Sequence, residues 1–112
     1  MRRDVRFTSQ GSQCVGWLYL PDDLAAGSKA PGIVMANAIT ATKEMVLPAY
    51  AERLAAAGYA CLAFDFRFLG ESGGEPRGQI FAMEQIEDLR NATSWLSAQP
   101  EVDANRIGAW GA

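Results

Sequence analysis

Two continuously apolar runs, separated by a segment of helical periodicity, constrain the fold of this chain more than any other feature. Residues 32–36 read GIVMA and residues 59–64 read YACLAF. Runs without polar alternation are typical of strands that helices bury on both faces. Strand, helix and strand in this order predict a right-handed βαβ unit with parallel strands. The helix is expected to turn one apolar face inward, formed by Val46, Tyr50, Leu54 and Ala57.

Proline and glycine predict where the helices begin and end. Pro48 is tolerated only in the first turn of a helix, so the first helix is expected to begin near Leu47. Gly58 is well placed to end it. A second amphipathic helix is predicted from about Ala82 to Ala98. Its inward face is expected to consist of Ile86, Leu89, Thr93 and Leu96.

Further strands are predicted before and after this unit. Residues 3–8 alternate between polar and apolar types, and residues 13–20 form a second strand-like segment, which together predict an antiparallel hairpin. A last short strand contains Ile107, Ala109 and Trp110. The predicted order is ββ-βαβαβ. This order predicts an α/β fold in which the hairpin joins a mostly parallel sheet with helices on both faces.

The composition bounds the classes of protein to consider. The chain has 112 residues, 49% of them hydrophobic, and a net charge of −3. It can form one domain with its own core. Its charge gives no reason to expect a nucleic acid or an anionic membrane as a partner. No apolar run approaches the roughly 20 residues that span a bilayer, and the N-terminus lacks the apolar stretch of a signal peptide. We therefore expect a cytoplasmic protein.

The cysteines give no indication of a disulfide or a metal site. Cys14 and Cys61 each lie within an apolar run and are expected to be buried thiols. The chain contains no histidine, so it offers no Cys/His spacing for metal binding.

Four stretches carry a family resemblance. Residues 102–108 read VDANRIG and lead into Ala109-Trp110-Gly111-Ala112, and the other three stretches are residues 32–44, 64–77 and 85–88. Together they resemble the dienelactone-hydrolase-like branch of the α/β-hydrolases, which includes the group of X-Pro dipeptidyl-peptidases and cocaine esterases. The resemblance covers nearly the whole chain, but only the front part of the family's domain.

This resemblance implies a serine hydrolase whose nucleophile lies beyond this chain. Gly111 and Ala112 would be the first two positions of the Gly-x-Ser-x-Gly nucleophile elbow, with the serine immediately after Ala112. The acid and the histidine follow the serine in α/β-hydrolases, so no triad residue is expected within residues 1–112. These residues would be the N-terminal portion of a single domain, inactive without the remainder. No metal or organic cofactor is implied.

The loop after the first buried strand is expected to supply one oxyanion-hole donor. The family has His-Gly at the positions of Asn37-Ala38, and the segment closes with Lys43-Glu44 as it does here. By resemblance, the backbone N–H of Ile39 is the donor, and the second comes from the residue after the missing serine. Glycine adopts positive φ at less cost than alanine. The Asn37-Ala38 pair therefore also supports a second interpretation, a non-catalytic α/β-hydrolase-like binding protein.

The literal motif Gly70-Glu71-Ser72-Gly73-Gly74 is not expected to be the nucleophile elbow. An elbow needs a strand that runs directly into the first glycine and a helix just after the serine, and neither surrounds Ser72. Asp65 and Arg67 belong to the same loop in the family and are expected to pair with each other or with backbone. A dinucleotide site is not expected, because no Gly-x-Gly-x-x-Gly follows the first buried strand.

The predicted activity is hydrolysis of an ester-type acyl bond by a nucleophile–histidine–acid triad beyond Ala112. The expected partners are a small-molecule ester or thioester and the remainder of the same hydrolase domain, with neither nucleic acid nor membrane involved. Ester, thioester, lactone and peptide bonds all remain open as substrates, because the residues that form the acyl pocket in this fold follow later in the chain.

Overall fold

The computed structural model describes residues 1–38 and 40–111, and its elements confirm the predicted order. In this part of the chain five strands form one mixed sheet and two helices pack on it. The elements are β1 (Arg2–Ser9), β2 (Ser12–Tyr19), β3 (Ala30–Ala36), α1 (Leu47–Ala56), β4 (Ala60–Phe64), α2 (Ala82–Ser97) and β5 (Val102–Gly111).

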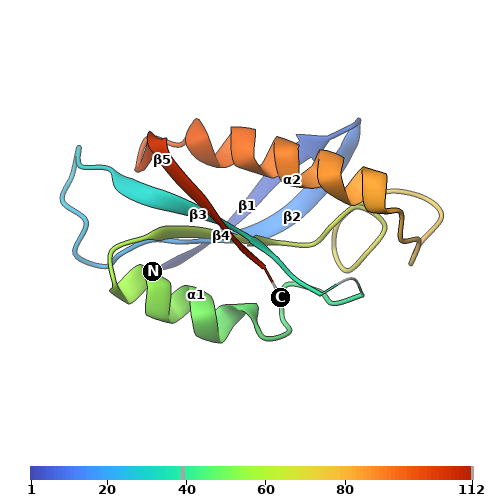
Figure 1. The fold of residues 1–112 in the computed structure, drawn as a ribbon, viewed down its shortest axis with the longest axis horizontal. Coiled ribbons are helices and arrows are strands. Elements are labelled where there is room, and N and C mark those ends of the chain that lie inside the picture. Colours follow the sequence, from blue (N-terminus) through green and yellow to red (C-terminus); the bar gives the residue numbers. More distant parts are fainter. Residues whose placement is uncertain (39, 112) are drawn as a thin grey trace.

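The strands lie in the order β1-β2-β4-β3-β5 (Figure 1). β1 pairs with β2 as an antiparallel hairpin, and β2 is antiparallel to β4. β3 is parallel to both β4 and β5. The five residues of β4 are all buried, because β4 has a strand on each side and a helical layer on each face. The predicted hairpin and parallel sheet are both confirmed.

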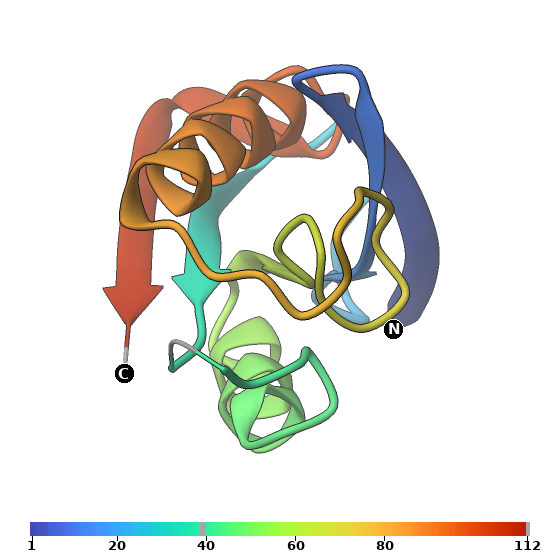
Figure 2. The same ribbon diagram turned by 90° about the vertical axis from the view of Figure 1, so that its right-hand side faces the viewer.

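The helices cover opposite faces of the sheet (Figures 1 and 2). On the α2 face, Leu96 and Ala92 pack with Leu18, Leu62 and Phe64 in one apolar cluster. On the α1 face, a smaller cluster joins α1 to the other side of the sheet. Its buried members are Tyr19, Met35, Leu47, Ala51, Ala55, Cys61 and Ala63.

The predicted inward face of α1 is confirmed at Leu54, which packs against the core, and is wrong at Val46, Tyr50 and Ala57, which are exposed. The buried residues are Leu47, Ala51 and Ala55, whereas Val46 and Tyr50 are exposed. Positions four apart on a helix lie on one face, and two alanines there let the helix approach the sheet closely. Tyr50 instead lies against Trp110 of β5, with ring centroids 4.9 Å apart.

The predicted inward face of α2 is also wrong in part. Leu96 is buried and Leu89 is partly buried, as expected, but Ile86 is 49% exposed. Ile86 lines a groove between α2 and the end of β5, together with Val34, Leu89 and Ala109. The apolar residues of α2 recur at helical spacing as predicted, but the side chain of Ile86 lines a groove instead of packing in the core.

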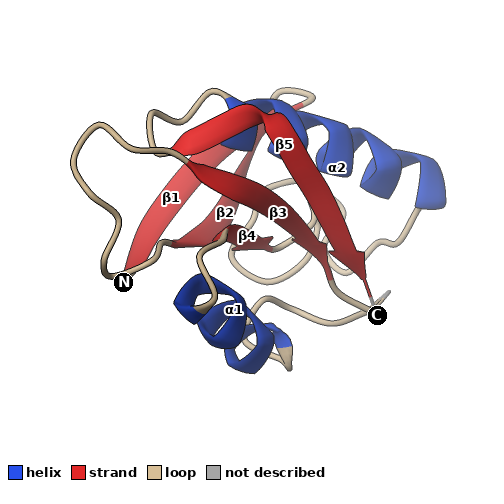
Figure 3. Ribbon diagram, turned by 60° about the vertical axis from the view of Figure 1, so that its left-hand side comes forward, coloured by secondary structure: helices blue, strands red, loops and turns tan. Residues whose placement is uncertain are grey.

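β5 lies at the edge of the sheet and is irregular. Asp103 pairs with Pro31, but the next pair is Ile107 with Gly32, so residues 104–106 bulge out of the register. In the described part of the chain β5 pairs with β3 alone, and most of its residues are exposed (Figure 3). The predicted short strand around Ile107, Ala109 and Trp110 is confirmed, but the strand already begins at Val102.

The α1 face can be tested with two alanines of the same helix. Ala51 is fully buried and Ala56 is exposed. We expect Ala51→Glu to lower the free energy of unfolding by about 3 kcal/mol or more, because an unpaired carboxylate enters the core. Ala56→Glu should cost less than about 1 kcal/mol. Urea denaturation followed by circular dichroism measures both, and equal losses would contradict this packing.

Candidate active site

The carboxyl ends of β3, β4 and β5 lie together at one end of the sheet, because these strands run parallel. The register pairs Ala36, the last residue of β3, with Gly111, the last residue of β5. Asn37 and Asp65 directly follow β3 and β4. In open α/β sheets, ligands bind at this end, next to the strand ends. Two loops therefore define the candidate site, residues 37–46 and residues 65–81.

Asn37 holds the first loop in place through its side chain. Its Nδ2 donates to the carbonyls of Thr42, at 2.8 Å, and Met45, at 2.7 Å. Its Oδ1 accepts from the N–H of Ala38 at 2.9 Å. The amide thus joins the start of the loop to its far end, which gives Asn37 a structural role at the position where the resemblance predicts histidine.

Ala38 needs no glycine-like backbone. Among the described residues other than glycine, positive φ occurs at Gln10, Val46 and Phe68, so Ala38 lies outside that group. The loop is strained at Val46 instead, where φ is 67° and ψ is −47°. The N–H of Leu47 donates to the carbonyl of Met45 at 2.7 Å across this tight turn. A β-branched residue at positive φ persists only where its surroundings fix it.

Asp65 connects the two loops. Its Oδ1 accepts from the backbone N–H of Lys43 at 2.7 Å, and its Oδ2 accepts from the backbone N–H of Glu71 at 3.0 Å. Gly70 permits this arrangement, because its φ is +53° and an added Cβ would lie 2.5 Å from the Asp65 carboxyl carbon. The buried carboxylate therefore fixes both loops to the end of β4.

Lys43 is the main residue of the site that the sequence analysis did not single out for a role. Its side chain is fully buried, and Nζ lies 3.0 Å from Asp65 Oδ2, 2.5 Å from Glu71 Oε1 and 3.0 Å from Glu44 Oε2. Nζ also lies 4.8 Å from the centre of the Trp17 ring. Burial lowers the pKa of Lys43, but the three carboxylates outweigh it and raise the pKa above its usual range. The only sequence signal that could have identified Lys43 was the Lys43-Glu44 pair, which the resemblance places at the end of this segment.

Three carboxylates in this cluster have a spacing that suits a metal ion. One oxygen each of Glu44, Asp65 and Glu71 lies within 4.8 Å of the others. The Lys43 ammonium contacts all three of these side chains. We therefore assign these carboxylates to the lysine rather than to a metal.

Arg67 pairs with α2 and not with Asp65. Its Nε lies 2.6 Å from Asp88 Oδ1, and its Nη2 donates to Glu87 and to the carbonyl of Glu84. Burial lowers the pKa of Arg67, but the bonds to Asp88 and Glu87 outweigh it and raise the pKa. Of the two predicted alternatives, pairing with each other or with backbone, the structure shows the second, and the charged partners are Lys43 for Asp65 and Asp88 for Arg67. Their predicted bonds to backbone are confirmed.

Ser72 has a structural environment. It is 2% exposed, its Oγ donates to the carbonyl of Asp65 at 2.6 Å, and it accepts from the N–H of Val15 at 2.9 Å. Neither a strand end nor a helix start adjoins it. The Gly-x-Ser-x-Gly match at residues 70–74 therefore ties the second loop to β2.

The remaining predicted site residues are placed in part. Gly111 ends β5 next to Ala36, where an added Cβ would be 3.9 Å from the nearest heavy atom. The predicted oxyanion donor Ile39 and the elbow residue Ala112 lie outside the described residues. Their proposed roles rest on their places in the chain, directly after Ala38 and Gly111.

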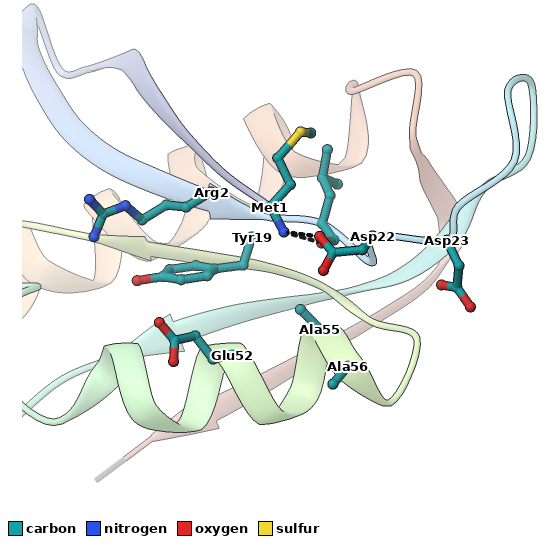
Figure 4. A pocket seen from close by; sticks show the side chains of 9 residues that line it. Met1, Arg2, Tyr19, Asp22, Asp23, Glu52, Ala55 and Ala56 are labelled. Atoms are coloured by element: carbon teal, nitrogen blue, oxygen red, sulfur yellow. Dashed lines mark hydrogen bonds and ion pairs between the residues drawn. The ribbon is translucent and has the colours of Figure 1, made fainter.

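A separate surface pocket of about 410 Å³ lies between β2 and the last turns of α1 (Figure 4). Glu52 and Ala55 line it from α1, and the Met1 ammonium pairs with Asp22 at 2.6 Å beside it. The hydroxyl of Tyr19 is buried and has no hydrogen-bond partner in the described part of the chain. The candidate site adjoins the other end of α1, so this pocket does not belong to it.

The two cysteines are buried free thiols, as predicted. Burial raises the pKa of Cys14 and of Cys61 to about 12 in each case. Over residues 1–38 and 40–111, neither helix has both the length and the apolar character needed to cross a membrane.

The sequence and fold agree with one known family. Residues 13–112 match the family described as X-Pro dipeptidyl-peptidase (S15 family). The chain belongs to this family. The dienelactone-hydrolase-like resemblance is thereby confirmed at the level of the α/β-hydrolase superfamily.

Individual relatives support the same assignment. The chain is 41% identical over 108 residues, 96% of its length and 34% of the relative's, to the quorum-quenching protein AidA of Acinetobacter baumannii (strain MDR-ZJ06). It is 39% identical over 109 residues to the thiohydrolase aneE of Aspergillus aculeatus, covering 96% of this chain and 33% of the relative.

A solved structure shows the same fold. The crystal structure of the α/β hydrolase GrgF from Penicillium sp. sh18 matches 99% of this chain and 37% of that chain, with a TM-score of 0.90 and 34% identity. The chain spans about a third of the length of the curated relatives that it matches.

The structural role of Ser72 predicts a loss of stability. We expect Ser72→Ala to lower the free energy of unfolding by about 1–3 kcal/mol, because the buried N–H of Val15 loses its partner. Ser28→Ala, in an exposed loop, is the matched control and should change it by less than about 0.5 kcal/mol. Chemical denaturation measures both, and equal stabilities would contradict the buried role of Ser72.

The raised thiol pKa values predict slow modification. At pH 8 a thiol with a pKa of about 12 is almost wholly protonated, and the thiolate is the reactive form. We expect Ellman's reagent to titrate Cys14 and Cys61 only after denaturant is added. Rapid reaction of either thiol in the native protein at pH 8 would show that its burial is incomplete.

Proposed function

We propose that the complete protein is a serine hydrolase that cleaves an ester-type acyl bond, with its nucleophile directly after Ala112. The pairing of Ala36 with Gly111 carries this proposal, because it sets the end of β5 beside the start of the 37–46 loop. An elbow nucleophile and an oxyanion donor must lie side by side in this way. Membership of the S15 family and the similarity to a thiohydrolase support hydrolase chemistry.

The mechanism follows from that arrangement. The serine hydroxyl attacks the acyl carbonyl while a histidine takes its proton, and an acid orients the histidine. The N–H of residue 39 and that of the residue after the serine stabilise the negative oxygen of the tetrahedral intermediate. Water then releases the acyl group. In this mechanism, the described residues of the chain place the end of β5 beside the end of β3 and the start of the 37–46 loop.

The remainder of the domain is proposed to pack on both faces of β5. A groove of about 480 Å³ runs along one face, bordered by Ile33, Leu54 and Trp110. On the other face a groove of about 390 Å³ lies between α2 and Ala109. β5 also offers an unpaired edge in the described part of the chain, and such edges are normally paired or covered. Later helices and a further strand would satisfy all three surfaces.

The proposed substrate is a small-molecule ester or thioester. Thioesters are favoured by the name of the thiohydrolase relative, which is 39% identical to this chain. The two buried free thiols and the absence of a spanning helix in the described residues are consistent with the proposed cytoplasmic location.

A non-catalytic binding protein is the second candidate. The Asn37-Ala38 pair in place of His-Gly favours it, although Asn37 can brace the loop by itself. The two candidates differ at the position after Ala112. A serine there is required for the hydrolase, whereas any residue other than serine, cysteine or aspartate favours the binding protein.

Labelling of the complete protein with a fluorophosphonate tests the proposal. We expect one covalent adduct, on the residue that follows Ala112, and loss of the adduct and of ester hydrolysis when that residue is replaced by alanine. Such a loss is about 10⁶-fold in kcat for a serine nucleophile. Ser72→Ala is the internal control and should keep the label. An unlabelled, properly folded protein would exclude the serine mechanism.

A further inference from the structure

Lys43 carries a charge that is completely removed from solvent. Its side chain has no exposed surface, and its ammonium uses its three N–H donors on Glu44, Asp65 and Glu71. Two of these carboxylates reach solvent, since the side chain of Glu44 is 50% exposed and that of Glu71 is 65% exposed. Only Asp65 is as deeply buried as the lysine. The Lys43–Asp65 pair is therefore the inner part of the cluster.

Stability alone does not explain such a pair. Taking two charges out of water costs about as much as their attraction returns, and apolar residues of equal volume often serve a fold equally well. A buried ion pair does, however, define a position, because an ammonium surrounded by three carboxylates has one favourable place.

The pair positions the 37–46 loop. Asp65 accepts both from Nζ of Lys43, at 3.0 Å, and from its backbone N–H, at 2.7 Å, so main chain and side chain are fixed together. Asn37 fixes the loop at its start. Residue 39 lies between these two anchors in the sequence. The positive φ of Val46 shows that the loop is held in a conformation that it would not otherwise favour.

We propose that Lys43 is a positioning residue of the active site: through its ion pair with Asp65 it fixes the loop that supplies the oxyanion-hole N–H of residue 39. This inference rests on the proposed hydrolase function. Lys43 itself contacts carboxylates and the Trp17 ring and acts on the reaction only through the loop.

The first test replaces the charge and keeps the length of the side chain. In the complete protein, Lys43→Met should lower kcat about 10- to 100-fold, because a misplaced oxyanion donor loses part of its effect. KM should stay within about twofold, since the donor acts mainly in the transition state. Lys29→Met is the matched control: Lys29 is the other lysine of the chain and is exposed. It should leave both constants unchanged.

Two further measurements distinguish a positioning role of Lys43 from a purely structural one. A boronic acid that mimics the tetrahedral intermediate should bind Lys43→Met more weakly, by a factor similar to the loss in kcat. Ethylammonium chloride should raise the kcat of Lys43→Ala at least about fivefold over the same concentration of sodium chloride, because it returns a cation to the cluster. An unchanged kcat, or equal affinity for the boronic acid, would overturn the proposal.

The double variant Lys43→Met/Asp65→Asn covers the case in which the single variants do not fold, because it leaves no unpaired buried charge. A folded double variant with kcat still reduced at least about tenfold supports the positioning role. Recovery of kcat together with stability would assign the pair to folding alone, and so would failure of the double variant to fold. Fluorophosphonate labelling of the wild-type protein comes first. If the wild-type protein is not labelled, the proposed function fails. If the wild-type protein is labelled and Lys43→Met is fully active, only the positioning role of Lys43 is rejected.

Discussion

The carboxylate of Asp65 is the interaction on which this edge of the molecule depends. It stands at the end of β4, the middle strand of the sheet in the described residues, and accepts hydrogen bonds from two loops. Its own backbone carbonyl accepts from Ser72, which in turn holds β2. The side chain of Asp65 thus ties the central strand to both site loops, and its backbone carbonyl connects them to the hairpin through Ser72. Gly70 must be small and at positive φ for this reason.

A second buried carboxylate serves the other side of the sheet. Asp88 of α2 accepts from the backbone N–H of Arg67 at 2.8 Å, from its guanidinium, and from the hydroxyl of Ser9 at 2.5 Å. It therefore joins α2, the loop after β4 and the end of β1. Because both carboxylate oxygens of Asp88 have donors, its charge is compensated where it is buried. Helix α2 is thus connected to the loop that follows β4 by polar contacts as well as by the apolar core.

The sequence predicted the elements and their order, because apolar runs, Pro48 and Gly58 act locally. The sequence did not predict features that depend on residues distant in the chain but close in space, such as the buried face of a helix and the partners of charged side chains. The phase of α1 is set by how closely Ala51 and Ala55 approach the sheet, which no spacing of larger apolar residues reveals. The partners of Asp65 and Arg67 come from residues 22 and 21 positions away. Lys43 is polar in sequence and fully buried in the fold, and only three-dimensional packing brings it under the Trp17 ring.

The departure at Asn37-Ala38 from the His-Gly pair that the resemblance predicts is accommodated by contacts within the loop. An amide offers two donors and one acceptor, and Asn37 uses them on two carbonyls and one N–H of its own loop. Among the described residues of this loop, positive φ occurs at Val46 and not at Ala38, so alanine meets no such backbone strain at position 38. The loop's conformation is thus maintained by an amide at its start and by an ion pair at Lys43. The features that first favoured a non-catalytic protein are therefore local substitutions with local compensation among the described residues of the loop, next to the paired ends of β3 and β5.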